Sequence, residues 1–387
     1  MVAVSERGLT VGLSSNVLET GGGFGHPDGI GTYTRELERE LIAAGVSVRR
    51  IGAPVRVGAR LIAPKEASLK FSLPLPWLAA GATALRTTIP GVAAIEREID
   101  LYHATDYMVP RLPRTPLVAT IHDAIPIAHP EWANPRLRRI KNWLLRSCAS
   151  CADLVIAVSE AAVPELVEHY RIPPARIRVV PLGVDARWFV RPDDALIRQT
   201  LASRALAPGY FLHVGTLQPR KNLDALVSAY EQLPPTVRSQ RQLVLVGKYG
   251  WGAHALQARL EALRARGRIV WLDYVGRDEL QALYWSAGVF VFPSLAEGFG
   301  LPLLEALAVG LPAIASDLPV LREVAQYHAE FVSPRRVDAL ADAMARAHEA
   351  SDDMIASAAR REHAQRFDWK TVAARTIEVY RELTTGR

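Results

Sequence analysis

Short runs of apolar, β-branched residues alternate with helical patterns along the whole chain, and this alternation constrains the fold more than any other feature. Each run is followed by a loop and then by a segment with apolar residues at helical spacing, which is typical of parallel sheets with crossover helices. The expected strands of the first half lie at 10–13, from 51, and at 101–102, 116–121, 153–158 and 177–181. Those of the second half lie at 210–214, 242–246, 269–272, 289–292 and 312–315.

The chain length adds a domain count to this pattern. With 387 residues the chain is too long for one ordinary core and suits about two domains. We expect an α/β fold of two Rossmann-like domains, 1–190 and 191–368, facing each other across a cleft, with 185–208 as a linker that holds one short helix. Segment 369–383 has the apolar spacing of a final helix. Such halves bind ligands at the carboxyl ends of their strands.

Composition excludes several classes of protein. Hydrophobic residues make up 49% and charged residues 22%, which excludes disorder as the main state. No window reaches the ~18 apolar residues of a membrane span, and residues 1–17 lack the pattern of a secretory signal, so we expect a cytoplasmic protein. Two cysteines, Cys148 and Cys151, stand in a C-x-x-C spacing. We expect them to pack as small apolar residues, with a redox pair as the alternative.

Basic residues are concentrated in the first half, although the net charge is only +6. Segment 49–86 has basic residues with the single acid Glu66, and segment 136–146 has basic residues and no acid. An anionic membrane surface is one candidate partner, because Trp143, Leu144, Leu145 and the apolar segment 71–85 accompany these charges. Ordinary helices whose Lys and Arg stems cover apolar surface are the equal alternative. Nucleic acid ranks last, because no reading motif accompanies the basic residues.

The stretch 292–306 is the most informative part of the sequence. Gly298 and Gly300 let a backbone approach a ligand closely, and the helix that begins near Leu301 directs free N–H groups at an anion. Glu297 and Glu305 accept hydrogen bonds, which suits sugar hydroxyls. The plainer alternatives are a solvated loop acid for Glu297 and a first-turn helix acid for Glu305.

A second motif, from Gly215 to Asn222, places Arg220 and Lys221 at the start of a helix. Two cations there oppose the helix dipole, so an anion should offset them, and a diphosphate would do so. A solvated basic turn is the alternative.

Two further motifs lie in the first half. A glycine-rich loop over 21–31, with Gly29 and Gly31 at its end, could bring backbone amides to a phosphate or sugar, but it is not a dinucleotide fingerprint. His122 and Asp123 follow an apolar strand, and His103 and Asp106 form a similar, weaker pair. A lone histidine is more often structural than catalytic, but the position of His122 after an apolar strand makes the two interpretations about equal.

Taken together, the 297–305 segment, the 220–222 turn, the Ala-Val-Ser at 157–159 and the Pro-Leu-Gly-Val-Asp at 181–185 resemble family-four, retaining glycosyltransferases of GT-B fold. The resemblance covers nearly the whole chain, is weakest over 52–98, and is greatest to bacterial mannosyl- and rhamnosyltransferases of surface-polysaccharide (lipopolysaccharide) assembly. It implies that the final helix, 369–387, crosses back to the first domain.

The resemblance also implies roles for individual residues. Glu297 would hold hydroxyls of the donor sugar, Glu305 the nucleotide ribose, and Arg220 and Lys221 the diphosphate. His122 would contact the transferred sugar near the reacting carbon. The remaining substrate-binding candidates are Gly29, Gly31, Gly215, Gly298, Phe299, Gly300, Leu301 and Val275. Base-reading candidates near Tyr249, Trp251 and Val275 are positional only.

The expected reaction is therefore transfer of a hexose, with retention, from a nucleotide diphosphate sugar to a glycan or lipid-linked glycan. GDP-mannose is the favoured donor on resemblance alone, and no other cofactor is expected. No Asp-x-Asp motif occurs, so a divalent metal is not indicated. Alternatives are an epimerase or a phosphorylase of the same fold, or a non-catalytic nucleotide-sugar-binding partner.

Overall fold

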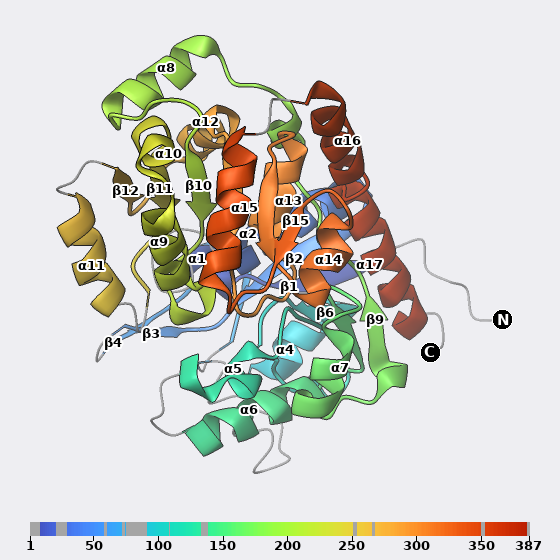
Figure 1. Cartoon of the computed structure of the whole chain (residues 1–387). Helices are drawn as coiled ribbons and strands as arrows, with labels where there is room; N and C mark the ends of the chain where they lie inside the picture. The colour runs from blue at the N-terminus through green and yellow to red at the C-terminus, as the bar shows by residue number, and fades with distance from the viewer. Residues whose placement is uncertain are drawn as a thin grey trace. The chain divides into compact units, whose positions relative to one another are not determined.

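The computed structural model describes residues 8–20, 29–57, 60–71, 74, 91–107, 109–132, 138–250, 254–264, 268–349 and 353–384. The chain divides into two compact units (Figure 1). The first unit comprises Met1–Gly183 with Asp368–Arg387, and the second comprises Val184–Phe367. The sequence pattern had suggested a boundary after residue 190.

The first unit is built on a seven-stranded sheet in the order β5-β2-β1-β6-β7-β8-β9, and neighbouring strands are parallel throughout. The strands are β1 (Thr10–Ser14), β2 (Ser47–Gly52), β5 (Leu69–Lys70), β6 (Leu101–Ala104), β7 (Leu117–Ile121), β8 (Leu154–Ala157) and β9 (Ile177–Val179). A separate antiparallel hairpin joins β3 (Val55–Val57) to β4 (Arg60–Ile62). The helices are α1 (Asn16–Thr20), α2 (Gly29–Ala43), α4 (Val92–Glu96), α5 (Ile125–Ala128), α6 (Arg138–Ser150), α7 (Val163–Glu165) and α17 (Trp369–Thr384).

One strand of this sheet was placed wrongly by the sequence pattern. A strand was expected to begin at Ile51, whereas β2 ends there, at Gly52. Its first four residues alternate between exposed and half-buried, and only Ile51 and Gly52 are buried. The apolar signal therefore marks the end of the strand alone. The central strands β6, β7 and β8 are buried at every position and match the expected positions closely.

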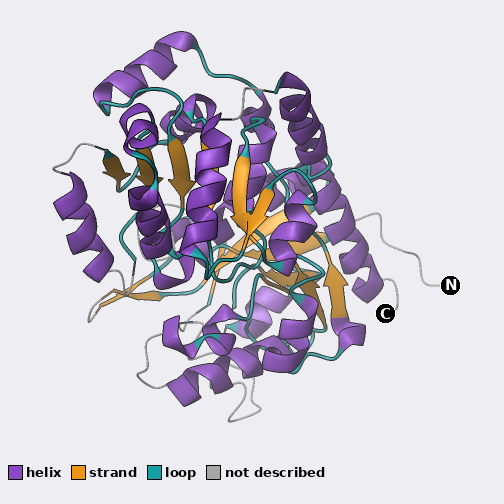
Figure 2. Cartoon of the chain, viewed as in Figure 1, coloured by secondary structure: helices purple, strands orange, loops and turns teal. Residues whose placement is uncertain are grey.

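The second unit is a six-stranded parallel sheet in the order β12-β11-β10-β13-β14-β15, which is the Rossmann order 3-2-1-4-5-6. Helices cover both faces of the sheet (Figure 2). The strands are β10 (Phe211–Val214), β11 (Leu243–Val246), β12 (Ile269–Leu272), β13 (Val289–Phe292), β14 (Ala313–Ser316) and β15 (Glu330–Val332). The helices are α8 (Asp194–Ser203), α9 (Leu223–Gln232), α10 (Pro235–Gln240), α11 (His254–Arg264), α12 (Arg277–Ser286), α13 (Leu301–Ala308), α14 (Pro319–Ala325), α15 (Val337–Glu349) and α16 (Met354–Gln365).

The segment 185–208, expected to be a linker, is an integral part of the second unit. Its helix α8 packs against α12, and Arg204 Nε lies 2.7 Å from Glu279 Oε1. Trp188, in a 3-10 turn before α8, is buried edge-on against Tyr284 at 4.9 Å between ring centroids. The linker interpretation was wrong because α8 contributes few apolar side chains to the core, so its sequence is dominated by its charged exposed face.

The final helix α17 belongs to the first unit and packs on α2, as expected. The hydroxyl of its buried Tyr380 lies 2.7 Å from His103 Nδ1 of β6, and Glu382 pairs with Arg178. The two cysteines are free, at the end of α6 and just after it. Cys148 is fully buried, and burial raises the pKa of its thiol to about 12. No helix in the described ranges is both long and apolar enough to cross a membrane.

Candidate functional site

The strand order of the second unit reverses at β10, which lies between β11 and β13. Chains therefore leave the carboxyl ends of β10 and β13 in opposite directions, and this switch point is the usual ligand position in such sheets. The loop after β10 carries Gly215, Arg220 and Lys221, and the loop after β13 carries Glu297. The two main sequence motifs thus meet at one edge of one sheet.

Glu297 joins the two motifs through ion pairs with Arg220 and Lys221. We call these three residues the Glu297 cluster. Lys221 Nζ lies 2.5 Å from Glu297 Oε1, and Arg220 Nη1 lies 3.2 Å from Oε2. The backbone adds a further link, because Leu295 N–H donates to the carbonyl of Arg220 at 2.7 Å. The Lys221 and Glu297 side chains are 7% and 8% exposed, so this pair is shielded from solvent.

The cluster fixes the charge of its carboxylate. Burial by itself raises the pKa of Glu297, but the charges of Lys221 and Arg220 outweigh it and lower the pKa to about 2. Glu297 is therefore ionised at neutral pH, and the cluster carries one surplus positive charge. The reading of Glu297 as a solvated loop acid was wrong, because its partners were 76 residues away in the sequence.

The anion that was expected to offset Arg220 and Lys221 is thus already present within the protein. Both cations lie in the 3-10 turn Pro219–Lys221, and Asn222, in the left-handed conformation with φ 56°, separates this turn from α9. The Asn222 side chain donates to the carbonyls of Pro293 and Pro334. It ties the β10 loop to the β13 loop.

The aromatic rings of Phe292 and His213 lie next to the cluster. Lys221 Nζ lies 4.7 Å above the ring of Phe292, and His213 stacks on that ring at 6.0 Å. His213 Nδ1 lies 2.9 Å from the carbonyl of Val291, and burial lowers the His213 pKa to about 4, so the ring is neutral. A Cβ at residue 215 would lie 3.3 Å from both His213 Nε2 and Lys221 Cε. A side chain at position 215 would crowd Lys221, whereas glycine leaves room for it.

The loops after β10 and β11 are joined at the same edge. Leu217 N–H donates to the carbonyl of Lys248, and Gly250 N–H donates to that of Leu217. A Cβ at Gly247 would lie 2.0 Å from the carbonyl oxygen of Gly215, a separation that no side chain tolerates. Gly247 thus allows the two backbones to meet and supports the position of Gly215.

The Gly298–Leu301 segment leads into α13. Gly300 precedes the helix with φ 104°, a conformation that favours glycine, and a Cβ there would lie 2.7 Å from Leu321. Phe299 is 4% exposed, and its ring packs edge-on against Phe367, so its side chain belongs to the core. The helix begins at Leu301, as expected, with Pro302 as its second residue.

Glu305 is the fifth residue of α13, so its interpretation as a first-turn helix acid was wrong. The hydroxyl of Tyr284 donates to Glu305 Oε2 at 3.1 Å. Burial raises the Glu305 pKa to about 8, against the lowering effects of the Tyr284 hydrogen bond and of the Arg277 charge. The electrostatic influence of Arg277 places the start of α12 near Glu305. A carboxyl group with this pKa is mostly protonated at neutral pH.

The remaining candidates of the second unit lie at the same sheet edge. Val275, between β12 and α12, is 7% exposed and therefore buried. Tyr249 pairs with Leu217 in the strand-like bridge between the two loops. Trp251 lies outside the described residues.

In the first unit, His122 follows β7 and is 8% exposed. Its Nε2 lies 3.1 Å from the carbonyl of Thr105, and its ring meets Tyr33 edge-on at 5.0 Å. Gly29 and Gly31 were expected in a loop, but they form the first turn of α2. Gly31 is buried there, and Gly29 is exposed. Residues 21–28 of the glycine-rich loop lie outside the described part of the chain.

His103, the histidine of the second candidate pair, is structural. His103 is fully buried, and its two ring nitrogens lie 2.7 Å from the Tyr380 hydroxyl and 2.8 Å from Thr120 Oγ1. Burial lowers the His103 pKa to about 3, so the ring stays neutral. The strand pattern that made His103 resemble His122 could not reveal these partners.

Sequence reasoning missed Tyr284 and Tyr33, the neighbours of Glu305 and His122. Helical spacing marks both as core positions, but it does not identify the polar group that each hydroxyl reaches. Over the described ranges, no three His, Cys, Asp or Glu side chains approach closely enough to hold a metal ion.

Comparison with known proteins agrees with this geometry. Residues 27–188 match the family model described as Glycosyltransferase Family 4, and residues 203–365 match Glycosyl transferases group 1. The O-antigen chain mannosyltransferase B of Escherichia coli is 32% identical over 286 residues, which span 73% of this chain and 74% of that protein.

Solved structures share the fold across both units. Anabaena Alr3699/HepE in complex with UDP and glucose aligns with a TM-score of 0.72 at 21% identity, covering 97% of this chain and all of that one. WaaG, a glycosyltransferase involved in lipopolysaccharide biosynthesis, aligns with a TM-score of 0.69 at 16% identity, covering 96% of this chain and 99% of that one. The two Rossmann-like units, the returning helix α17 and these matches agree, and the chain belongs to the family 4 glycosyltransferases of GT-B fold.

Proposed function

We propose that the protein transfers a hexose, with retention and without a metal ion, from a nucleotide diphosphate sugar to a glycan or lipid-linked glycan in surface-polysaccharide biosynthesis. Mannose is the favoured sugar and GDP the favoured nucleotide. The observation that supports this most is the Glu297 cluster at the switch point of the second sheet, in a chain similar to an O-antigen mannosyltransferase.

The surplus positive charge of the cluster suits a leaving diphosphate. Arg220 can hold phosphate oxygens with parallel N–H donors, and Lys221 acts as a point charge. The backbone amides of 298–301 lie at the start of α13, which favours negative charge. Fixed donors aimed at developing charge are worth about 3–4 kcal/mol each. In this mechanism they replace a divalent cation.

The state of Glu297 argues against a carboxylate nucleophile. Two cations stabilise its negative charge and lower its pKa, so the carboxylate is a weak base and a weak nucleophile. Retaining chemistry through a covalent intermediate needs such a nucleophile. We therefore propose that the acceptor attacks from the face that the diphosphate leaves, and that the departing phosphate takes the acceptor proton. Glu297 orients the donor sugar and holds Lys221 in place.

Glu305 is proposed to bind the ribose of the nucleotide. A carboxylate accepts hydrogen bonds from the two ribose hydroxyls only when ionised, whereas the free protein holds Glu305 mostly protonated at neutral pH. Donor binding would then release a proton from Glu305.

The first unit is proposed to supply the acceptor side, with His122 near the transferred sugar and Gly29 and Gly31 close to it. A cytoplasmic protein that binds the inner membrane face fits a lipid-linked acceptor. Helix α6 supports that proposal, because Ile140 and Trp143 are 58% and 45% exposed, one turn apart, beside the exposed Arg138, Arg139 and Lys141. The other basic segment is partly neutralised, since Arg50 pairs with Glu38 and Glu66. Arg86, the last basic residue of segment 49–86, lies outside the described residues, and so does Arg136 of segment 136–146.

The deciding experiment screens GDP-, UDP-, ADP- and dTDP-linked sugars by thermal shift and then assays transfer to a mannosyl acceptor. GDP-mannose should stabilise the protein by RT ln(1+[L]/Kd), and the product should keep the α configuration by NMR. Arg220→Gln should abolish the shift, and Arg335→Gln, an exposed arginine of the same unit, should not. Binding without transfer would favour the non-catalytic partner. Change of the donor sugar without an acceptor would favour the epimerase, and a need for free phosphate the phosphorylase.

A further inference from the structure

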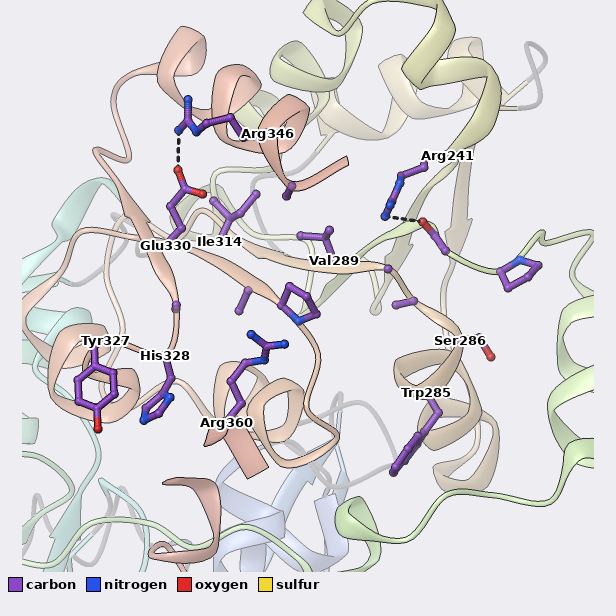
Figure 3. A pocket seen from close by; sticks show the side chains of 18 residues that line it. Arg241, Trp285, Ser286, Val289, Ile314, Tyr327, His328, Glu330, Arg346 and Arg360 are labelled. Atoms are coloured by element: carbon purple, nitrogen blue, oxygen red, sulfur yellow. Dashed lines mark hydrogen bonds and ion pairs between the residues drawn. The ribbon is translucent and has the colours of Figure 1, made fainter. Parts of the chain in front are cut away.

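A cavity lies at the amino-terminal edge of the second sheet, where β10, β13 and β14 begin (Figure 3). The Glu297 cluster is at the carboxyl ends of the same strands, so the two sites lie at opposite edges of the sheet. The cavity has a volume of about 700 Å³, within the range of small-molecule sites.

The cavity wall is rich in guanidinium groups. Arg241 precedes β11, Arg346 comes from α15 and Arg360 from α16, and Glu330 is the lining carboxylate that opposes them. Figure 3 shows that these arginines come from separate elements and that the guanidinium of Arg346 lies against the Glu330 carboxylate. Asp342 lies near Arg346, whereas Arg361 lies over the ring of the lining Trp285. The wall therefore has an excess of positive charge.

Each guanidinium is held by the protein itself, and Arg346 is held by an ion pair in which its Nη2 lies 2.5 Å from Glu330 Oε1. Arg241 Nη1 donates to the carbonyl of Gly209 at 3.0 Å and its Nε to His348 Nδ1 at 2.8 Å. Arg360 Nε donates to the carbonyl of Gly310 at 2.9 Å. Fixed donors lose less conformational entropy on binding than flexible ones.

The position of the Arg241 side chain depends on the backbone next to it. A Cβ at Gly288 would lie 2.2 Å from Arg241 Nη1 and 2.6 Å from the carbonyl oxygen of Gly209. Residue 288 must therefore be small for the guanidinium to lie against the start of β13.

The rest of the wall offers flat, mostly neutral surfaces. Trp285 lines one side, and Tyr327 and His328 lie against each other at 4.3 Å on another. Burial, together with the nearby His363 and Arg360, lowers the His328 pKa, so this ring adds no charge at neutral pH. Aromatic faces of this kind suit the ring of a sugar.

We propose that this cavity binds a phosphate monoester of the size of a sugar phosphate. A phosphate group presents three oxygens to donors from several directions, which matches arginines from separate elements better than the two oxygens of a carboxylate. The site goes beyond the proposed transfer reaction and does not depend on it.

The test uses the full chain and a local signal. In protein labelled with ¹⁵N-tryptophan, the indole resonance of Trp285 reports this cavity. That of Trp271, which donates to the carbonyl of Gly247 at 2.9 Å, reports the opposite edge. Substitutions Trp285→Phe and Trp271→Phe assign the two signals. Mannose 6-phosphate should shift the Trp285 signal saturably, while mannose and sodium chloride at equal ionic strength should not.

Matched variants decide the outcome. Arg360→Gln should weaken binding about tenfold, the effect of one charged hydrogen bond. Glu330→Gln should tighten it about threefold by removing the opposing charge. Arg198→Gln, an exposed arginine on α8, should leave it unchanged. A Trp285 signal that stays fixed, or that shifts equally with mannose, would overturn the proposal. So would equal affinities in the Arg360→Gln and Glu330→Gln proteins.

Discussion

Lys221 and Glu297 form a shielded ion pair, with 2.5 Å between Nζ and Oε1, that joins two loops far apart in the sequence. A substrate is not needed to assemble this part of the site, because the protein supplies the anion itself. A ligand that enters must share Lys221 with Glu297, so the carboxylate moderates how tightly an anion is held.

Replacement of Lys221 by Met should destabilise the second unit. Glu297 would stay buried with only the longer Arg220 contact, and breaking a buried pair costs about 3 kcal/mol. The double variant Lys221→Met/Glu297→Gln should recover much of this loss, because no under-paired charge remains. Calorimetric melting measures both, with the exposed Lys370→Met as control. A single variant that melts like the wild type would contradict the buried-pair description.

Glu305 should make stability fall as the pH rises. Its pKa is about 8 in the folded protein, above the ordinary value of 4.5, so its stabilising contribution is complete below about pH 4.5 and is lost as the pH rises through 8. Between these limits stability should decrease by up to about 1.4 kcal/mol per pH unit. Urea unfolding across this window should show the slope in wild type and a flatter profile in Glu305→Gln. Equal slopes would mean that Glu305 is not the group responsible.

The affinity of the protein for GDP should rise with pH, whereas its stability should fall. If the ribose hydroxyls need the ionised carboxylate, affinity should rise up to about tenfold per pH unit until the pH reaches about 8 and then level off. Isothermal titration in buffers of different ionisation enthalpy would count the released proton. Glu305→Gln should release none. Proton release that persists in this variant would assign the linkage to another group.

The substitution Gly247→Ala should disrupt the donor side. Its Cβ would lie 2.0 Å from the Gly215 carbonyl oxygen, and neither backbone can yield without moving the β10 loop. We expect a loss of about 1–3 kcal/mol, as for other overpacked sites, together with weaker nucleotide binding. Gly276→Ala is the matched control, because a Cβ there meets nothing within 4 Å. Comparable losses in both variants would exclude the contact as the cause.

Helix α6 should bind anionic vesicles through one face. Replacing Ile140 and Trp143 together by Ser should weaken binding to phosphatidylglycerol vesicles about tenfold or more, through lost apolar burial. Loss of Arg139 should instead make binding less sensitive to salt. Vesicle sedimentation measures both effects. Binding that is unchanged in the Ser variant would locate the membrane contact, if any, elsewhere.

The sequence predicts the buried strands and the chemistry at their carboxyl ends well. Strands such as β8 and β13 are apolar at every position, so composition alone reveals them, and residues just after such strands lie at a ligand-binding edge. The position of Arg220, Lys221 and Glu297 on one edge follows from that rule.

Pairings across the fold were not predictable in the same way. The partner of Glu297 could not be identified locally, because Lys221 is brought to it by the strand order. Edge elements were also poorly predicted. The short strand β15 has one buried residue, and α8 owes its position to Arg204 and Trp188 rather than to a wide apolar face.

The return of α17 to the first unit makes the second unit an insertion within the first. The contact between His103 and Tyr380 therefore closes the first unit across 277 residues of chain, and the whole of Val184–Phe367 lies between the two partners. Removal of α17 would thus leave the amino-terminal unit with an incomplete core, whereas the second unit would keep every residue of its own.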